Sequence, residues 1–97
     1  MVNINIVFDG AFEDADIIAV PDEIAPEIKE IGQQFLDWVP NAKEKDYWTI
    51  INEQRIVVAE TDGFIKWLNS CCCAGKNKAF VVARNTNYCP RYQTIEF

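Results

Sequence analysis

The stretch from Pro21 to Val39 constrains the fold of this 97-residue chain more than any other. Its apolar residues recur at alternating steps of four and three, a spacing that places them on one face of a helix. This apolar face consists of Ile24, Ile28, Ile31, Phe35 and Trp38. At about 100° per residue the apolar stripe covers nearly half of the helix circumference, and a stripe of that width favours packing against a sheet. The sequence therefore predicts a long amphipathic helix that forms the spine of the core. Asp22 can cap this helix with Pro26 in its first turn, or Ala25 is the cap and Pro26 is the first helical residue.

One pair of strands is predicted before this helix and another pair after it. Residues 2, 4, 6 and 8 are apolar and alternate with Asn3, Asn5 and Val7, which indicates a strand with one buried face. A turn begins at Asp9-Gly10, and residues 16–20 read as the returning strand of a hairpin. After the helix, the β-branched and aromatic runs 47–51 and 55–59 predict a second hairpin.

The last third of the chain predicts one more helix and two more strands. Thr61 or Asp62 can cap the helix, which ends near Gly75. Residues 79–83 are apolar on both faces, which favours a central or well-covered strand, and residues 91–97 can add a strand at an edge. The expected product is a single α+β domain of two layers, in the order ββαββαββ. It has a mostly antiparallel sheet of five or six strands and two helices on one face.

The absence of histidine is the strongest chemical constraint in the sequence. It excludes Ser-His and Cys-His nucleophile pairs and most zinc sites, and no glycine-rich phosphate-binding motif is present. We therefore expect a protein that is not an enzyme and that needs neither cofactor nor metal.

The cysteines leave several chemical roles open. Cys71, Cys72 and Cys73 are contiguous, unlike the dispersed cysteines of a disulfide-stapled secreted domain, and Cys89 is the fourth. They can serve as small buried residues, one of them can pair with Cys89, or they can hold a metal, although three neighbours on a helix cannot close a tetrahedral site. Reduced thiols, the lack of an apolar run of about 18 residues and the lack of a basic leader together predict a cytoplasmic protein outside membranes.

Charge is distributed unevenly around the net value of −6. Up to Pro40 the chain carries nine carboxylates against a single lysine, Lys29, whereas from Asn41 onward eight basic residues exceed six acidic ones. Direct binding of nucleic acid is disfavoured, because an acidic chain repels phosphate.

The acidic half supplies the first candidate binding surface. On the predicted helix, carboxylates at steps of four and three lie roughly 5–6 Å apart, and at strand step two roughly 7 Å apart, a spacing similar in scale to that of phosphates along a DNA strand. Such a row can occupy a groove of arginine and lysine side chains on a larger, basic, nucleic-acid-handling protein. Alternatively, these acids form a solvated polar face, or the loop binds a hard cation. The candidate residues are Glu23, Glu27, Glu30 and Asp37 on the helix, and Asp9, Phe12, Glu13, Asp14 and Asp16 in and after the loop.

The last quarter of the chain supplies an alternative site. Cations and aromatic rings gather there in a pattern that can hold an anionic nucleotide, which would make the protein a small-molecule binder or sponge, acting as a homo-oligomer. The same charges can simply protect an edge strand from aggregation. These residues are Lys76, Lys78, Arg84, Tyr88, Arg91 and Tyr92.

A short, acidic, histidine-free α+β chain resembles in composition the small inhibitors that phages encode against bacterial defence systems, including anti-CRISPR proteins. The resemblance implies a non-enzymatic inhibitor that binds a larger protein, and it assigns no residue a role. We therefore expect a small acidic binding protein. A thiol enzyme that uses Cys89 or the cysteine cluster ranks last among the hypotheses, because no base is available.

Overall fold

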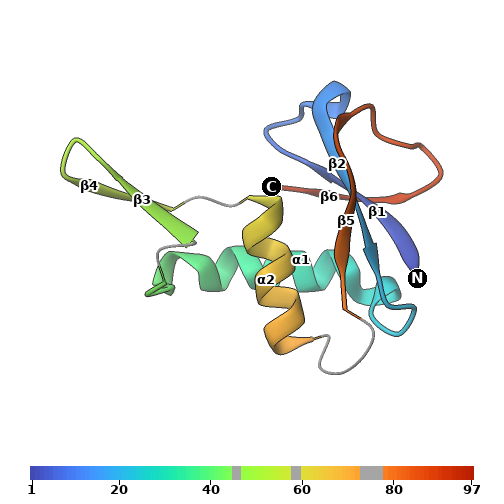
Figure 1. The fold of residues 1–97 in the computed structure, drawn as a ribbon, viewed down its shortest axis with the longest axis horizontal. Coiled ribbons are helices and arrows are strands. Elements are labelled where there is room, and N and C mark those ends of the chain that lie inside the picture. Colours follow the sequence, from blue (N-terminus) through green and yellow to red (C-terminus); the bar gives the residue numbers. More distant parts are fainter. Residues whose placement is uncertain (45–46, 58–59, 73–77) are drawn as a thin grey trace.

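The computed structural model describes residues 1–44, 47–57, 60–72 and 78–97. Its strands and helices are arranged as in Figure 1. Three 3₁₀-helices, η1 (Phe12–Asp14), η2 (Ala25–Glu27) and η3 (Val39–Asn41), lie between the main elements in these residues. The expected α+β class with two α-helices is confirmed. The main elements are β1 (Val2–Val7), β2 (Ala15–Val20), α1 (Ile28–Trp38), β3 (Trp48–Ile51), β4 (Gln54–Val57), α2 (Thr61–Cys71), β5 (Phe80–Thr86) and β6 (Gln93–Glu96).

Four strands form one sheet in the order β5-β2-β1-β6. β1 pairs antiparallel with β2, with Ile4 opposite Ile18, and parallel with β6, with Ile6 opposite Ile95. Among the described residues, β3 and β4 pair with each other and form a separate two-stranded sheet. The expectation of a single sheet of five or six strands is therefore wrong, because the second hairpin forms its own sheet. The four-stranded sheet is mixed, with two antiparallel pairings and one parallel pairing.

β5 lies at an edge of the four-stranded sheet. Its side chains Phe80 and Val82 are 52% and 49% exposed. Two register shifts interrupt its pairing with β2, and such bulges are common at sheet edges. The expectation that residues 79–83 form a central or well-covered strand is therefore wrong. A continuous apolar run is consistent with burial on both faces, but it does not fix which strand becomes the edge.

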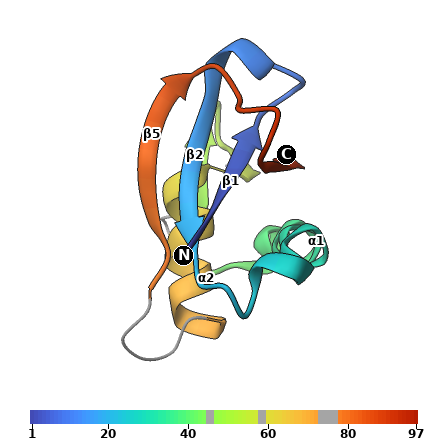
Figure 2. The ribbon, with the colours of Figure 1, turned by 90° about the vertical axis from the view of Figure 1, so that its right-hand side faces the viewer.

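Both α-helices pack against the same face of this sheet, because their buried side chains share one core cluster with alternate residues of β1 and β2. Figure 2 shows α1 end-on beside the sheet. Phe35 of α1 lies at the centre of the aromatic part of this core. Its ring centroid is 5.3 Å from that of Phe64, 5.4 Å from that of Trp67 and 5.7 Å from that of Phe97. The predicted apolar face of the helix thus packs against α2 and β6.

The α-helix is shorter than the sequence pattern predicts. It begins at Ile28 rather than at Pro21, because residues 22–24 form a turn and Ala25–Glu27 form the 3₁₀-helix η2, with Pro26 in its first turn. Proline lacks the N–H that an α-helix interior would use. Ile28, Ile31 and Phe35 are buried, whereas Trp38 remains 38% exposed.

The face of β1 that points away from the helices is also buried, although a strand with one buried face was expected. Asn5 and Val7 on this face are both 0% exposed. The Asn5 side-chain amide donates to the Cys89 carbonyl at 2.8 Å and to the Thr94 hydroxyl at 3.2 Å, and its carbonyl accepts from the Cys89 N–H at 2.9 Å. Through these hydrogen bonds, Asn5 holds the segment between β5 and β6 against this face of the sheet.

The β3–β4 hairpin extends away from the rest of the molecule (Figure 1). Its two-residue turn places Asn52 and Glu53 at positive φ angles of 51° and 65°, as a type I′ turn requires. The guanidinium of Arg55 lies 5.0 Å from the centroid of the Trp48 ring and donates to the Ala42 carbonyl, so the hairpin is linked to the chain after α1. The hairpin exposes Ile50, Ile51 and Ile56.

Candidate functional site

The acidic loop between β1 and β2 is held by contacts with the segment before β6. The Tyr88 N–H donates to the Phe12 carbonyl at 3.0 Å, and the two rings meet edge to face with centroids 5.1 Å apart. Phe12 therefore packs on Tyr88 and stays 38% exposed. The loop presents three exposed carboxylates, those of Asp9, Glu13 and Asp14.

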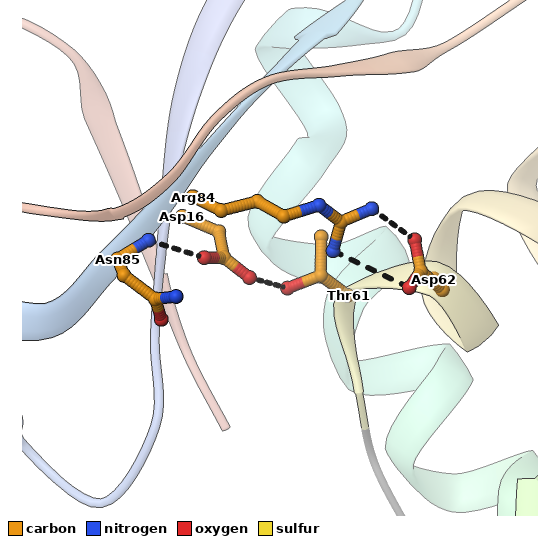
Figure 3. Close-up of polar contacts among 5 residues, drawn as sticks. All are labelled: Asp16, Thr61, Asp62, Arg84 and Asn85. Carbon is orange, nitrogen blue, oxygen red and sulfur yellow. Dashed lines mark hydrogen bonds and ion pairs between the residues drawn. The ribbon is translucent and has the colours of Figure 1, made fainter.

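Asp16 was expected to belong to the acidic binding surface with this loop, but its carboxylate forms hydrogen bonds with other elements of the fold (Figure 3). One carboxylate oxygen accepts a hydrogen bond from the Thr61 hydroxyl, and the other accepts from the Asn85 N–H at 3.1 Å. Thr61 is the first residue of α2, and it is 2% exposed. The expectation that Thr61 or Asp62 caps α2 is wrong, since the N-cap is Glu60 and no side chain caps the helix there. Asp16 is thus a structural link between β2, α2 and β5.

Arg84 lies beside this link and pairs with Asp62. Its two terminal nitrogens lie 2.6 and 3.3 Å from the two carboxylate oxygens of Asp62 (Figure 3). The hydrogen bond to Asp62 raises the pKa of Arg84, and the negative charges of Asp62 and Asp16 add to that increase. The adjoining cleft, of about 190 Å³, is also lined by Glu60. Because three carboxylates surround one guanidinium, this cleft disfavours an anionic ligand.

A second group of acids surrounds the start of α1. Glu23 lies in the turn before η2, Glu27 ends η2, and Glu30 lies in the first turn of α1, and all three side chains are exposed. Among the described residues, none of the three forms an ion pair with a basic side chain. Asp37, one residue before the end of α1, is exposed and accepts a hydrogen bond from the Gln33 side chain at 3.0 Å. The prediction that Glu23, Glu27 and Glu30 share the face of one α-helix is wrong, because α1 begins at Ile28, after Glu23 and Glu27.

The two groups of acids lie at opposite ends of the β1–β2 hairpin. Val2 pairs with Val20 at the end that leads to α1, whereas Ile6 pairs with Asp16 at the end that leads to the loop. Strands of six residues span about 20 Å. Glu23, Glu27 and Glu30 therefore lie toward one end of the hairpin, and Asp9, Glu13 and Asp14 lie at the other end.

The alternative ligand-binding residues are spread over several places. Lys78 precedes β5 and Arg84 lies six residues later, which corresponds to about 20 Å along a strand. Tyr88, Arg91 and Tyr92 lie in the segment before β6, where the Tyr92 hydroxyl accepts a hydrogen bond from Asn3 at 3.3 Å. Lys76 lies outside the described residues. The described members of this set therefore do not converge on one cavity.

The cysteines of the described residues lie in separate elements, Cys71 and Cys72 at the end of α2 and Cys89 before β6. Cys71 and Cys89 are free thiols, and Cys73 lies outside the described residues. Within residues 1–44, 47–57, 60–72 and 78–97, no group of three acidic, cysteine or histidine side chains is placed to hold a metal ion.

A groove between α1 and β6 is a feature that sequence reasoning missed. Four residues on one flank of α1 face three consecutive residues of β6 across it, and its volume is about 240 Å³. The helical spacing of these α1 residues is visible in the sequence, but their opposition to the last strand depends on the parallel pairing of β6 with β1. The lining residues are Lys29, Gly32, Gln33, Leu36, Thr94, Ile95 and Glu96.

Comparison with protein-family models, with curated proteins and with solved structures finds no match to this chain. No described helix is both long enough and apolar enough to cross a membrane.

Proposed function

We propose that this protein is a non-enzymatic binding protein that occupies a basic surface of a larger partner, and that the carboxylates at the start of α1 make the contact. The observation that carries the proposal is that Glu23, Glu27 and Glu30 are exposed and have no basic partner among the described residues. Carboxylates left unneutralised in this way attract a cationic surface through the field that they create.

A cationic groove that normally holds nucleic acid is the partner surface that this charge arrangement suits best. Carboxylates about one helical turn apart, as Glu27 and Glu30 are, present a short row of negative charge to such a groove. Arginine and lysine side chains that bind phosphate also bind carboxylate through charge-assisted hydrogen bonds. We therefore place the partner among nucleic-acid-handling proteins, and the mode of action is occlusion.

The loop carboxylates Asp9, Glu13 and Asp14 take a different part in this proposal. They lie at the other end of the β1–β2 hairpin, about 20 Å away. At that distance from the contact surface, they raise the rate of association through long-range attraction, and they do not change the rate of dissociation. Salt weakens this steering, because the Debye length is about 8 Å at physiological ionic strength.

The test is competition with nucleic acid for a partner captured from bacterial lysate. The protein is immobilised, and bound proteins are eluted with duplex DNA, with salt, or with the uncharged polymer dextran as a control. We expect DNA and salt to release the partner and dextran to leave it bound. A partner that DNA does not displace would show that a surface other than a phosphate-binding groove is occupied.

Two charge-reversed variants separate the two acidic groups. The Glu23→Lys, Glu27→Lys, Glu30→Lys triple variant should lose binding mainly through faster dissociation. The Asp9→Lys, Glu13→Lys, Asp14→Lys variant has the same net charge and should lose association rate and salt dependence only. Circular dichroism and urea unfolding confirm that both variants are folded. Equal affinity of the first variant and the unaltered protein would rule out this contact surface.

A further inference from the structure

The groove between α1 and β6 has the dimensions of a binding site for a short stretch of polypeptide. Its volume of about 240 Å³ lies below the range of about 300–1,000 Å³ that is common for small-molecule pockets, and it is enough for a few side chains. One wall is helical and the other is a strand at the edge of a sheet.

The outer edge of β6 pairs with no other strand among the described residues. Phe97 directs both its N–H and its C=O toward β1, since it donates to the Val7 carbonyl at 2.8 Å and accepts from the Asp9 N–H at 3.0 Å. Backbone direction alternates along a strand, so Ile95 also points toward β1, whereas Thr94 and Glu96 point outward. Two N–H groups and two C=O groups are thus available to an added strand.

The helical wall lies unusually close to this edge. A Cβ atom placed on Gly32 would be 2.9 Å from Cγ2 of Ile95, so the absence of a side chain at position 32 allows α1 to approach β6. The two elements run in roughly the same direction. Gln93 at the start of β6 donates to the Ala25 carbonyl before α1, and the ring of Phe97 after β6 contacts that of Phe35 later in α1.

This direction gives β6 an acidic end. Lys29 lies near the start of β6 and Leu36 near its end. The Thr94 hydroxyl accepts a hydrogen bond from Asn5 on the face of the sheet away from the helices, and Glu96, two residues later, points to that same face. A cation on a neighbouring strand therefore meets Glu96 on that face, while the residue next to the cation points toward α1 and Leu36.

We propose that this groove binds an extended segment of a partner protein as an added antiparallel strand, with lysine or arginine opposite Glu96 and an aliphatic residue opposite Ile95. An added strand can run parallel or antiparallel to β6, and antiparallel pairing is slightly more stable per residue. The cation pairs with Glu96 across the strands, and the aliphatic side chain points toward α1 and Leu36. Strand addition of this kind takes its affinity from backbone hydrogen bonds and its specificity from alternate side chains. The inference rests on the proposed function in one respect, namely that the partner is a basic protein.

The test uses a defined peptide and does not require the partner. The probe is the acetylated and amidated hexapeptide Thr-Thr-Lys-Val-Thr-Thr, whose β-branched residues favour an extended chain. It is titrated into ¹⁵N-labelled protein, and amide chemical shifts are followed by NMR. We expect shifts in β6 and along the groove flank of α1, from Lys29 to Leu36, and none in the exposed β3–β4 hairpin or β5.

A second peptide isolates the backbone hydrogen bonds. It is N-methylated at the lysine and at the threonine after the valine, the two residues that would face Glu96 and Thr94. N-methylation removes the N–H groups and keeps every side chain, so we expect binding to be lost. Equal binding of the two peptides would overturn strand addition, as would shifts confined to β5 or to the hairpin, or no binding of the first peptide at all.

Charge reversal at the acidic end tests the assigned contact. Glu96→Lys should weaken the lysine peptide about fivefold, and a peptide with glutamate in place of its lysine should recover that loss. Glu53→Lys, at the tip of the hairpin, makes the same change in net charge and should leave affinity unaltered. If the second peptide fails to rescue Glu96→Lys, the contact between Glu96 and the cation is wrong. Because Glu23, Glu27 and Glu30 are unchanged here, failure of this inference is distinct from failure of the proposed function.

Discussion

Thr61 donates its hydroxyl hydrogen bond to Asp16, and through this bond the first residue of α2 is attached to strand β2. Thr61 is 2% exposed. The other carboxylate oxygen of Asp16 accepts from the Asn85 N–H of β5 at 3.1 Å. One carboxylate thus fixes where α2 begins relative to two strands of the sheet.

We expect Asp16→Ala to lower the free energy of unfolding by about 1–3 kcal/mol, because a buried hydroxyl loses its acceptor. Asp14→Ala, on the exposed loop two residues earlier, should change it by less than about 0.5 kcal/mol. Urea unfolding measures both values. Thr61→Val closes a double-mutant cycle, which should give a coupling energy of about 0.5–3 kcal/mol with Asp16→Ala. A coupling energy near zero would mean that the Asp16–Thr61 bond does not stabilise the fold.

A second prediction concerns Asn5, which is fully buried and joins β1 to Cys89. In Asn5→Asp the new carboxyl group faces the Cys89 carbonyl without an amide donor, so burial should raise its pKa above the usual value of about 4. The folded state then binds more protons than the unfolded state, and the stability of the variant relative to the unaltered protein falls as the pH rises above about 4.

Urea unfolding at a series of pH values tests this prediction. Asn5→Asp should be much less stable at about pH 7 and should recover part of the loss at about pH 4. Asn87→Asp is the matched control, because Asn87 is exposed. A pH profile of Asn5→Asp that runs parallel to that of the control would show that position 5 is accessible to water.

A third prediction concerns the close approach of Gly32 to Ile95. In Gly32→Ala the added Cβ would lie 2.9 Å from Cγ2 of Ile95, which belongs to a stiff β-branched side chain. Overpacking costs about 1–3 kcal/mol, and the helical preference of alanine over glycine returns about 1 kcal/mol. We expect a net loss of about 1 kcal/mol in the free energy of unfolding.

The background of Ile95→Ala separates these two effects. There the clash is absent, so Gly32→Ala should instead stabilise the protein by about 1 kcal/mol. Both values come from urea unfolding of the four members of the cycle. A stabilising effect of Gly32→Ala in the unaltered protein would show that α1 and β6 can separate without cost.

The periodic part of the fold could be predicted from the sequence. The spacing of Ile28, Ile31 and Phe35 predicted the buried face of α1, and the alternation of residues 2–8 predicted β1. The length of the helix was overestimated, because an apolar pattern at steps of four and three does not distinguish an α-helix from a turn and a 3₁₀-helix before it. Pro26 was the one local signal of that boundary.

The long-range pairings could not be predicted. The parallel pairing of β6 with β1 joins residues about 90 positions apart, and no local pattern encodes it. This pairing places β6 beside α1, and it brings Cys89 and Thr94 to the far face of β1, where Asn5 is buried. The acidic residues were identified from composition, but their division into two groups depends on the direction of the β1–β2 hairpin.

The last prediction concerns Arg84, which would bind phosphate if the protein held an anionic nucleotide. The pKa of Arg84 is raised, first by its hydrogen bond to Asp62. Because its pKa is raised, the guanidinium stays charged, and its contribution to the free energy of unfolding is lost only as the pH rises through that pKa. Arg84 should therefore add no pH dependence to the stability between about pH 6 and about pH 9. Because the pair is exposed, Arg84→Ala should leave the thermal midpoint nearly unchanged.

Thermal unfolding of the protein and of Arg84→Ala, each with and without ATP, measures both effects. We expect ATP to shift neither midpoint, since Asp16, Glu60 and Asp62 surround the guanidinium with negative charge. Arg91→Ala, an exposed cation in the segment before β6, serves as the comparison. A stabilisation by ATP that disappears in Arg84→Ala and persists in Arg91→Ala would favour a nucleotide-binding protein over one that occupies a basic surface.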